Sequence, residues 1–125
     1  MTRRILVVDD NADNRNVLSR LLDFGGYLPE VAASARDAFA LAEATPPDLV
    51  LMDLSMPDID GWDATSRFKA DERLHEIPVI AVTGHVTGEE IRRAQEVGCS
   101  DIVSKPIDYY VLMDKIRHHL GDAAA

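Results

Sequence analysis

Short apolar runs alternate with stretches whose apolar residues recur at helical spacing, and this alternation occurs five times along the chain. Short apolar runs are typical of strands buried on both faces, and the wider spacing is typical of amphipathic helices. The predicted strands span residues 4–9, 27–32, 49–53, 78–83 and 101–104. Five strand-then-helix units predict an α/β fold with a parallel sheet, right-handed crossovers and helices on both faces.

Polar N-caps and glycines mark where the predicted helices begin and end. Asp10, Asn11 and Asp13 favour the start of a first helix, which Gly25 and Gly26 end. The apolar residues at helical spacing within it are Val17, Leu18, Leu21 and Leu22. The second, fourth and last helices are expected after Ser34, Thr87 and Asp108, and the third across about residues 62–70.

Individual residues then constrain how these elements are arranged. Pro29 lies in the weakest strand and cannot donate to a sheet ladder, so we expect that strand at an edge. Thr87 and Glu90 have the spacing of a capping box. We expect a flavodoxin-like (βα)5 doubly wound sheet with strand order 2-1-3-4-5, one of the common orders. The 125 residues suffice for a single domain, so we expect one domain over residues 1–125 and no output domain.

Composition narrows the classes of partner. The formal net charge of −9 should repel nucleic acid and anionic membranes, so we expect neither as a direct partner. No apolar run approaches the length that crosses a bilayer, and no signal peptide is visible. Cys99 is the single cysteine and cannot form an internal disulfide, which favours a reducing cytoplasm.

Five polar residues end the predicted strands: Asp9 and Asp10 the first, Asp53 the third, Thr83 the fourth and Lys105 the fifth. In the expected strand order they gather at one carboxyl edge, where such sheets bind ligands. Three carboxylates in one pocket repel one another, and Mg²⁺ would relieve that repulsion. A lysine and a hydroxyl donor suit phosphoryl oxygens, and phosphoryl transfer needs mainly positioning and charge neutralisation. The pattern therefore predicts that Asp53 accepts a phosphoryl group.

The same residues carry a family resemblance that covers the whole chain. The motifs are Asp9-Asp10, Asp53 with Met56-Pro57 and Gly61, Thr83-Gly84, and Lys105-Pro106. Each motif is weak alone, but all four stand at the ends of the appropriate strands. The chain resembles the receiver domains of bacterial two-component response regulators, and most closely the small single-domain receivers of the DivK type.

The resemblance implies roles for particular residues. Asp53 would be the phosphoacceptor, with Thr83 and Lys105 acting on the phosphoryl group. Mg²⁺ would be held by Asp10 and Asp53 directly, by Asp9 through water and by the backbone carbonyl of Ser55. The resemblance thus implies a signalling domain in which these residues form the catalytic and metal sites. Such a domain is not an enzyme and at most phosphorylates and dephosphorylates itself slowly.

The resemblance also implies partners and a route for output. A histidine kinase or histidine phosphotransfer protein would supply the phosphoryl group, and the surface of the fourth helix, fifth strand and last helix would control a downstream protein target. The Lys105–Pro106 peptide bond would be cis. Ile102 stands where many receivers have an aromatic residue, while Ser55 and His85 occupy variable positions that tune phosphoryl loss in the family.

Other interpretations of these residues stay open at this point. In one alternative, Asp9 and Asp10 serve only as helix caps and Lys105 is a solvated surface lysine. A Mg²⁺-dependent phosphatase or mutase with an aspartyl nucleophile is the alternative function, although its motif separates two aspartates by one residue, and Asp9 and Asp10 are adjacent. Flavin mononucleotide binding is disfavoured because the acidic loop after the first strand would repel phosphate.

Overall fold

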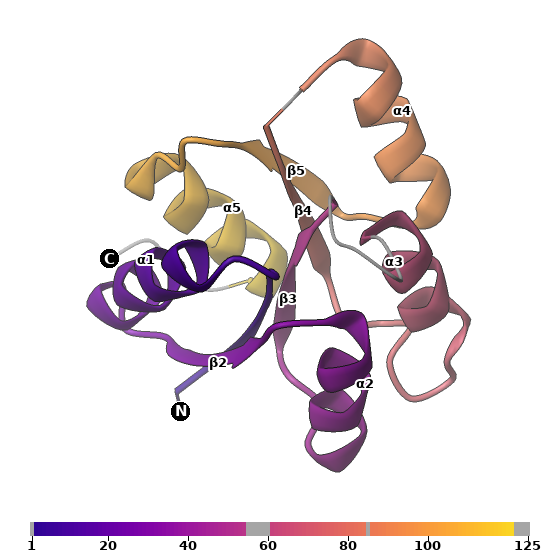
Figure 1. Ribbon diagram of the computed structural model, residues 1–125, viewed down its shortest axis with the longest axis horizontal. Coiled ribbons are helices and arrows are strands. Elements are labelled where there is room, and N and C mark those ends of the chain that lie inside the picture. The colour runs from indigo at the N-terminus through magenta and orange to yellow at the C-terminus, as the bar shows by residue number, and fades with distance from the viewer. Residues whose placement is uncertain (1, 55–60, 85, 122–125) are drawn as a thin grey trace.

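The computed structural model describes residues 2–54, 61–84 and 86–121, and Figure 1 shows how its strands and helices alternate. The strands are β1 (Arg4–Val8), β2 (Leu28–Ala32), β3 (Leu49–Asp53), β4 (Val79–Thr83) and β5 (Asp101–Ser104). The helices are α1 (Ala12–Phe24), α2 (Ala35–Ala44), α3 (Gly61–Ala70), α4 (Gly88–Val97) and α5 (Tyr109–Leu120).

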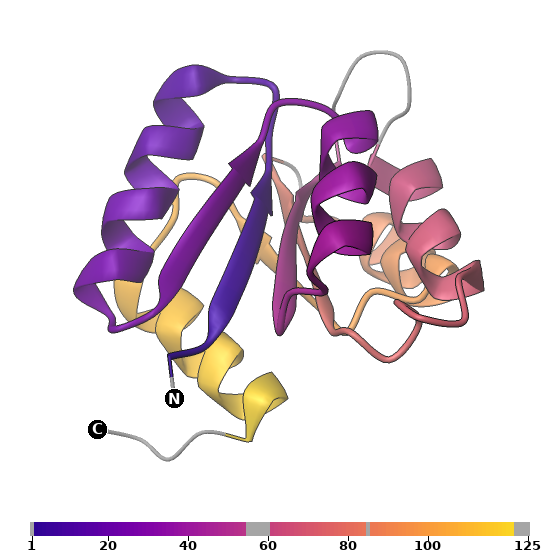
Figure 2. The same cartoon turned by 90° about the horizontal axis from the view of Figure 1, so that it is seen from below.

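The five strands form one parallel sheet in the order β2-β1-β3-β4-β5. Helices α1 and α5 cover one face, and α2, α3 and α4 lie on the other (Figure 1); Figure 2 shows the same two layers from below. This arrangement confirms the predicted fold class and strand order. β2 lies at an edge, as Pro29 indicated, because a proline there costs the sheet no interior hydrogen bond.

Alternating side chains of the central strands supply two cores, one on each face of the sheet. In β1, Ile5 and Val7 pack beneath α1 and α5, whereas Leu6 and Val8 pack beneath α2 and α3. All residues of β3 and β4 are buried. Because both faces are covered, these strands are continuously apolar rather than alternating, which explains the pattern in the sequence.

The N-caps confirm most of the predicted helix starts. The side chains of Ser34, Thr87 and Asp108 accept hydrogen bonds from backbone amides of their first turns. The first helix is capped by Asn11, whose side chain accepts from the Asn14 amide at 3.0 Å. The N-cap of α1 is therefore Asn11 and neither of the aspartates that precede it.

Two details differ from the sequence-based expectations. Val17 is 53% exposed although it occurs at helical spacing, because Leu18 and Leu22 alone form the buried stripe of α1. β1 ends at Val8, one residue earlier than predicted, so the first aspartate follows the strand rather than completing it. Within the described residues, no helix is both long and apolar enough to cross a membrane.

A charged cluster joins β5 to α5 at the end of the sheet opposite the strand carboxyl termini. Asp101 accepts hydrogen bonds from Lys115 Nζ at 2.8 Å and from His119 Nε2 at 2.9 Å. Burial alone would raise the pKa of Asp101, but these hydrogen bonds and that of the Ile102 amide outweigh it, and the pKa is lowered. Because the folded pKa lies below the unfolded value, the cluster stabilises the fold above about pH 4.

We predict that Asp101→Asn lowers the free energy of unfolding by about 1 kcal/mol at pH 7, since a partly exposed cluster loses charge-assisted hydrogen bonds. The difference from wild type should shrink as the pH falls below about 4 and through the folded pKa, because the wild-type carboxylate is then protonated too. Urea denaturation at pH 7 and at a pH below about 4 measures the difference in the free energy of unfolding. Asp114→Asn is the control, because Asp114 is exposed and its contact with Arg117 is long, at 3.5 Å. Equal effects of the two substitutions at pH 7 would contradict the prediction.

Candidate functional site

Three aspartates converge at the carboxyl edge of the two central strands. Asp53 is the last residue of β3, and Asp9 follows β1 directly. The strands are neighbours, with Val8 opposite Met52, so the residues after each partner also lie side by side. One carboxylate oxygen from each of Asp9, Asp10 and Asp53 lies within 4.8 Å of the others. The predicted gathering of these acids is therefore found.

Asp9 is the most deeply buried of the three acids. Its side chain is 1% exposed, and its Oδ1 accepts a hydrogen bond from the Asn11 amide at 2.9 Å. Its Oδ2 is buried, and no described residue donates a hydrogen bond to it. An unsatisfied buried carboxylate oxygen is costly, so this atom calls for a cation or a water molecule. Asp53 is 4% exposed, while Asp10 lies on the solvent side of the cluster.

Lys105 places a positive charge within 4 Å of both buried carboxylates. Its Nζ lies 3.6 Å from Asp9 Oδ2 and 3.6 Å from Asp53 Oδ1. These distances are ion pairs rather than hydrogen bonds, so the ammonium is close to both acids without being locked to either. The Lys105 amide donates to the Thr83 carbonyl at 2.8 Å, which joins the ends of β5 and β4. The Lys105–Pro106 peptide bond is cis, which confirms that prediction.

Thr83 ends β4 beside the acids, and its side chain has a partner that was not predicted. The residue is 4% exposed and pairs with Ser104 of β5 in the sheet. Its Oγ1 donates a hydrogen bond to Glu90 Oε2 at 3.0 Å. One half of the predicted capping box is found, because the Glu90 amide donates to Thr87 Oγ1 at 3.1 Å. The Glu90 carboxylate, however, accepts from Thr83.

Two polar contacts at this edge were missed from the sequence. One is the Thr83–Glu90 hydrogen bond, and the other joins Arg15 Nη1 to the Asp9 carbonyl at 2.8 Å. The capping-box spacing drew attention to Glu90 but indicated a different partner, and Arg15 carried no signal. Four residues named in the sequence analysis lie outside the described residues: Ser55, Met56, Pro57 and His85.

The donor set fits a hard divalent cation. Three carboxylates face a single ammonium group in the cluster, so the described side chains leave a net negative charge. Mg²⁺ is typically bound in proteins by one or two carboxylates together with water and phosphate oxygens. The buried Oδ2 of Asp9 is an acceptor that a metal-bound water would satisfy. The arrangement can hold such a cation and neutralise an incoming phosphoryl group.

Gly61 allows α3 to begin directly against the end of β3. A Cβ atom at this position would lie 2.1 Å from the Asp53 carbonyl oxygen and 2.5 Å from Leu54 Cα. The Gly61 amide instead donates to the Leu54 carbonyl at 3.2 Å. Only glycine tolerates this approach, so the residue holds the backbone of Asp53 in place through a close main-chain contact.

The fold and this polar edge together define a doubly wound α/β domain with a cluster of acids at the carboxyl edge of its sheet. The sequence matches the response regulator receiver domain family over residues 5–117, and the chain belongs to that family. The predicted resemblance is thereby confirmed. Membership supports a signalling function in two-component systems and gives no support to the phosphatase or mutase alternative.

Individual relatives agree with this assignment. The chain is 37% identical over 123 residues to the polar-differentiation response regulator DivK of Brucella ovis, which covers 98% of this chain and 100% of the relative. The N-terminal domain of a response regulator receiver protein from Methanoculleus marisnigri is 36% identical, with a TM-score of 0.79, and the match covers 94% of this chain and 96% of that one. The chemotaxis protein CheY4 of Vibrio cholerae is similar in fold, with a TM-score of 0.90 at 24% identity over 94% of this chain and 98% of its own.

We predict that Gly61→Ala lowers the free energy of unfolding by about 2 kcal/mol or more, because the added Cβ would force the backbone at Asp53 to move. Urea denaturation measures the loss. Gly88→Ala is the matched control: nothing lies within 4 Å of a Cβ at Gly88, and alanine is the better helix former. Gly88→Ala should be neutral or slightly stabilising. Equal stability of the two variants would show that the close contact at Gly61 is unimportant.

Proposed function

We propose that Asp53 accepts a phosphoryl group from a histidine kinase or a histidine phosphotransfer protein, and that this event controls binding to a downstream protein. The observation that carries the proposal is the buried Asp53 carboxylate, 3.6 Å from Lys105 Nζ and beside the carboxylates of Asp9 and Asp10. The proposed nucleophile, the carboxylates that would hold a cation and the Lys105 ammonium thus lie together at one edge of the sheet.

In the proposed transfer, a carboxylate oxygen of Asp53 attacks the phosphorus of the donor. A new O–P bond forms as the N–P bond to the donor histidine breaks, and the electron pair of that bond stays on the imidazole nitrogen. Mg²⁺, when bound, neutralises charge on the carboxylates and the transferred oxygens. Asp10 and Asp53 would hold it directly, Asp9 through water and Ser55 through its carbonyl.

Lys105 and Thr83 act on the product. The Lys105 ammonium, already near Asp53, pairs with an oxygen of the new phosphoryl group. The Thr83 hydroxyl donates to another oxygen after its side chain turns. Both residues hold the group and add no turnover of their own, so the domain is a phosphoacceptor with only slow self-phosphorylation and self-dephosphorylation.

Output in this proposal is a change in the surface formed by α4, β5 and α5. A partner protein binds the minor active state, and phosphorylation raises the population of that state. Ile102 is β-branched and stiff at χ1, so the change lies mainly at residues 84–88 and the start of α4. The net charge of −9 favours protein partners over nucleic acid or membrane, and the single cysteine suits a reducing cytoplasm.

We predict that wild-type protein with Mg²⁺ and a small-molecule phosphodonor gains the mass of a single phosphoryl group, and that Asp53→Asn gains none, because the amide is not a nucleophile. Intact mass spectrometry measures the label. Asp13→Asn removes the same charge from an exposed position in α1 and should label like wild type. Equal labelling of wild type and Asp53→Asn would refute Asp53 as the phosphoacceptor.

We predict that Asp10→Ala weakens Mg²⁺ binding by about tenfold or more, because a direct carboxylate ligand is lost. A Mg²⁺ titration followed by calorimetry or tryptophan fluorescence measures the affinity. Asp13→Ala is the control for lost negative charge near α1. If the two variants bound Mg²⁺ equally, Asp10 would contribute only long-range charge.

A further inference from the structure

The hydrogen bond between Thr83 and Glu90 links the candidate site to the first turn of α4. The donor and acceptor oxygens are 3.0 Å apart, and the acceptor is a carboxylate, so the bond is charge-assisted. Thr83 is 4% exposed and Glu90 is half-buried, which limits competition from water. Glu90 is also held in place, because its amide donates to Thr87 Oγ1.

A threonine hydroxyl has a single proton to donate. In the described structure that proton is directed at Glu90, whereas the proposed function requires it to be directed at a phosphoryl oxygen on Asp53. We propose that Glu90 is a positioning residue that holds Thr83 away from the phosphoryl group, so that phosphorylation must break the Thr83–Glu90 bond and release the first turn of α4. This inference rests on the proposed function and assigns a residue to its control.

The packing of α4 makes its first turn sensitive to one bond. Ala94 is the only residue of the helix that is buried, and Arg93 lies 4.4 Å from the centre of the Trp62 ring of α3. These contacts hold the second half of α4. Glu90 lies in the first turn, where Ile91 is 38% exposed, so the bond to Thr83 joins that turn directly to the end of β4.

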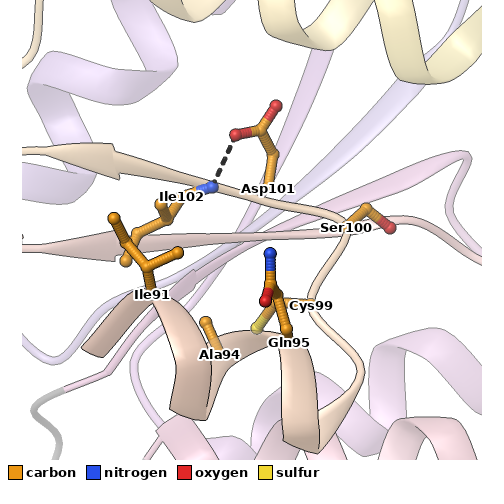
Figure 3. A pocket seen from close by; sticks show the side chains of 7 residues that line it. All are labelled: Ile91, Ala94, Gln95, Cys99, Ser100, Asp101 and Ile102. Atoms are coloured by element: carbon orange, nitrogen blue, oxygen red, sulfur yellow. Dashed lines mark hydrogen bonds between the residues drawn. The ribbon is translucent and has the colours of Figure 1, made fainter. Parts of the chain in front are cut away.

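A pocket of about 110 Å³, open to solvent, lies between α4 and β5, so the helix is not tightly packed against this strand. Figure 3 shows Ile91 and Ala94 of α4 facing Ile102 of β5 across this pocket. A helix that is incompletely packed against the sheet can shift without displacing a filled core. Loss of the Thr83–Glu90 bond would therefore be transmitted as a movement of the first turn of α4 relative to β5.

The simpler interpretation is that Glu90 only stabilises the helix, as acidic residues in a first turn do. Glu89 separates the two interpretations. It lies in the same turn, carries the same charge, is exposed, and has its carboxylate 3.9 Å from Arg92 rather than against Thr83. A dipole effect should be shared by both glutamates, whereas a bond to the hydroxyl of Thr83 belongs to Glu90 alone.

The test is the affinity of the Mg²⁺-loaded protein for beryllium trifluoride, a stable mimic of a phosphoryl group, titrated into wild type and variants. Glu90→Ala should bind the mimic more tightly by up to about tenfold, because Thr83 no longer has to leave an acceptor. Glu89→Ala should bind like wild type. Glu90→Gln keeps an acceptor oxygen but loses the charge, so its affinity should fall between those of wild type and Glu90→Ala.

A double substitution isolates the bond itself. In a Thr83→Val background the hydroxyl is absent, so adding Glu90→Ala should no longer change the affinity. Amide NMR shifts of the unphosphorylated Glu90→Ala protein at residues 86–92 should move toward those of wild type with the mimic bound. If Glu90→Ala proves unfolded by circular dichroism, Glu90→Gln carries the same test with a smaller expected gain.

Any of four outcomes would overturn the proposal. Equal affinities of Glu90→Ala and Glu89→Ala would leave only a helix-dipole effect. An undiminished effect of Glu90→Ala in the Thr83→Val background would show that the two side chains are not coupled. If wild type neither bound the mimic nor was labelled, the proposed function would be refuted together with this inference. If wild type bound the mimic normally and Glu90→Ala left the affinity unchanged, this inference alone would be refuted.

Discussion

Repulsion among three carboxylates is the constraint around which this domain is built. Asp9, Asp10 and Asp53 present oxygens within 4.8 Å of one another, and one oxygen of Asp9 is buried without a hydrogen-bond donor among the described residues. Such a cluster is unfavourable unless opposite charge is close. Lys105 supplies part of that charge from 3.6 Å. The negative charge that Lys105 leaves uncompensated would suit a divalent cation, as the proposed function requires.

The packing of the sheet holds these acids together against their mutual repulsion. β1 and β3 are central strands with apolar side chains packed on both faces, so their carboxyl ends cannot separate without exposing core. The close approach of Gly61 to the Asp53 backbone adds a second restraint from α3. Stability from the two cores is thereby used to maintain a charge arrangement that would otherwise relax.

The side of the sheet that carries α4 is built differently. α1, α2, α3 and α5 bury apolar stripes, whereas α4 buries Ala94 alone and leaves a pocket against β5. In the proposed switch, the buried strands would hold the site residues in place, and α4, which buries the fewest residues of the five helices, would transmit a change from Thr83. A weakly held element is suited to this role because a small change in free energy alters its population.

Local patterns in the sequence determined most of the architecture. Continuous apolar runs predicted buried parallel strands, caps such as Ser34 and Asp108 set helix starts, and Pro29 indicated an edge, because each depends on backbone chemistry near one position. The acids could be grouped because parallel strands bring their carboxyl ends to one edge. Their roles in phosphoryl transfer stay predictions.

Only the tertiary structure decided which side chains meet across elements. Glu90 had the spacing of a cap, yet its carboxylate accepts from Thr83, since the packing of α4 brings that hydroxyl within 3.0 Å. Val17 fitted a helical stripe but is 53% exposed, because the width of the buried stripe depends on what covers α1. Asp101 gained Lys115 and His119 as partners from α5 in the same way. Spacing along the chain fixes which face a residue occupies, and packing between elements selects its partner.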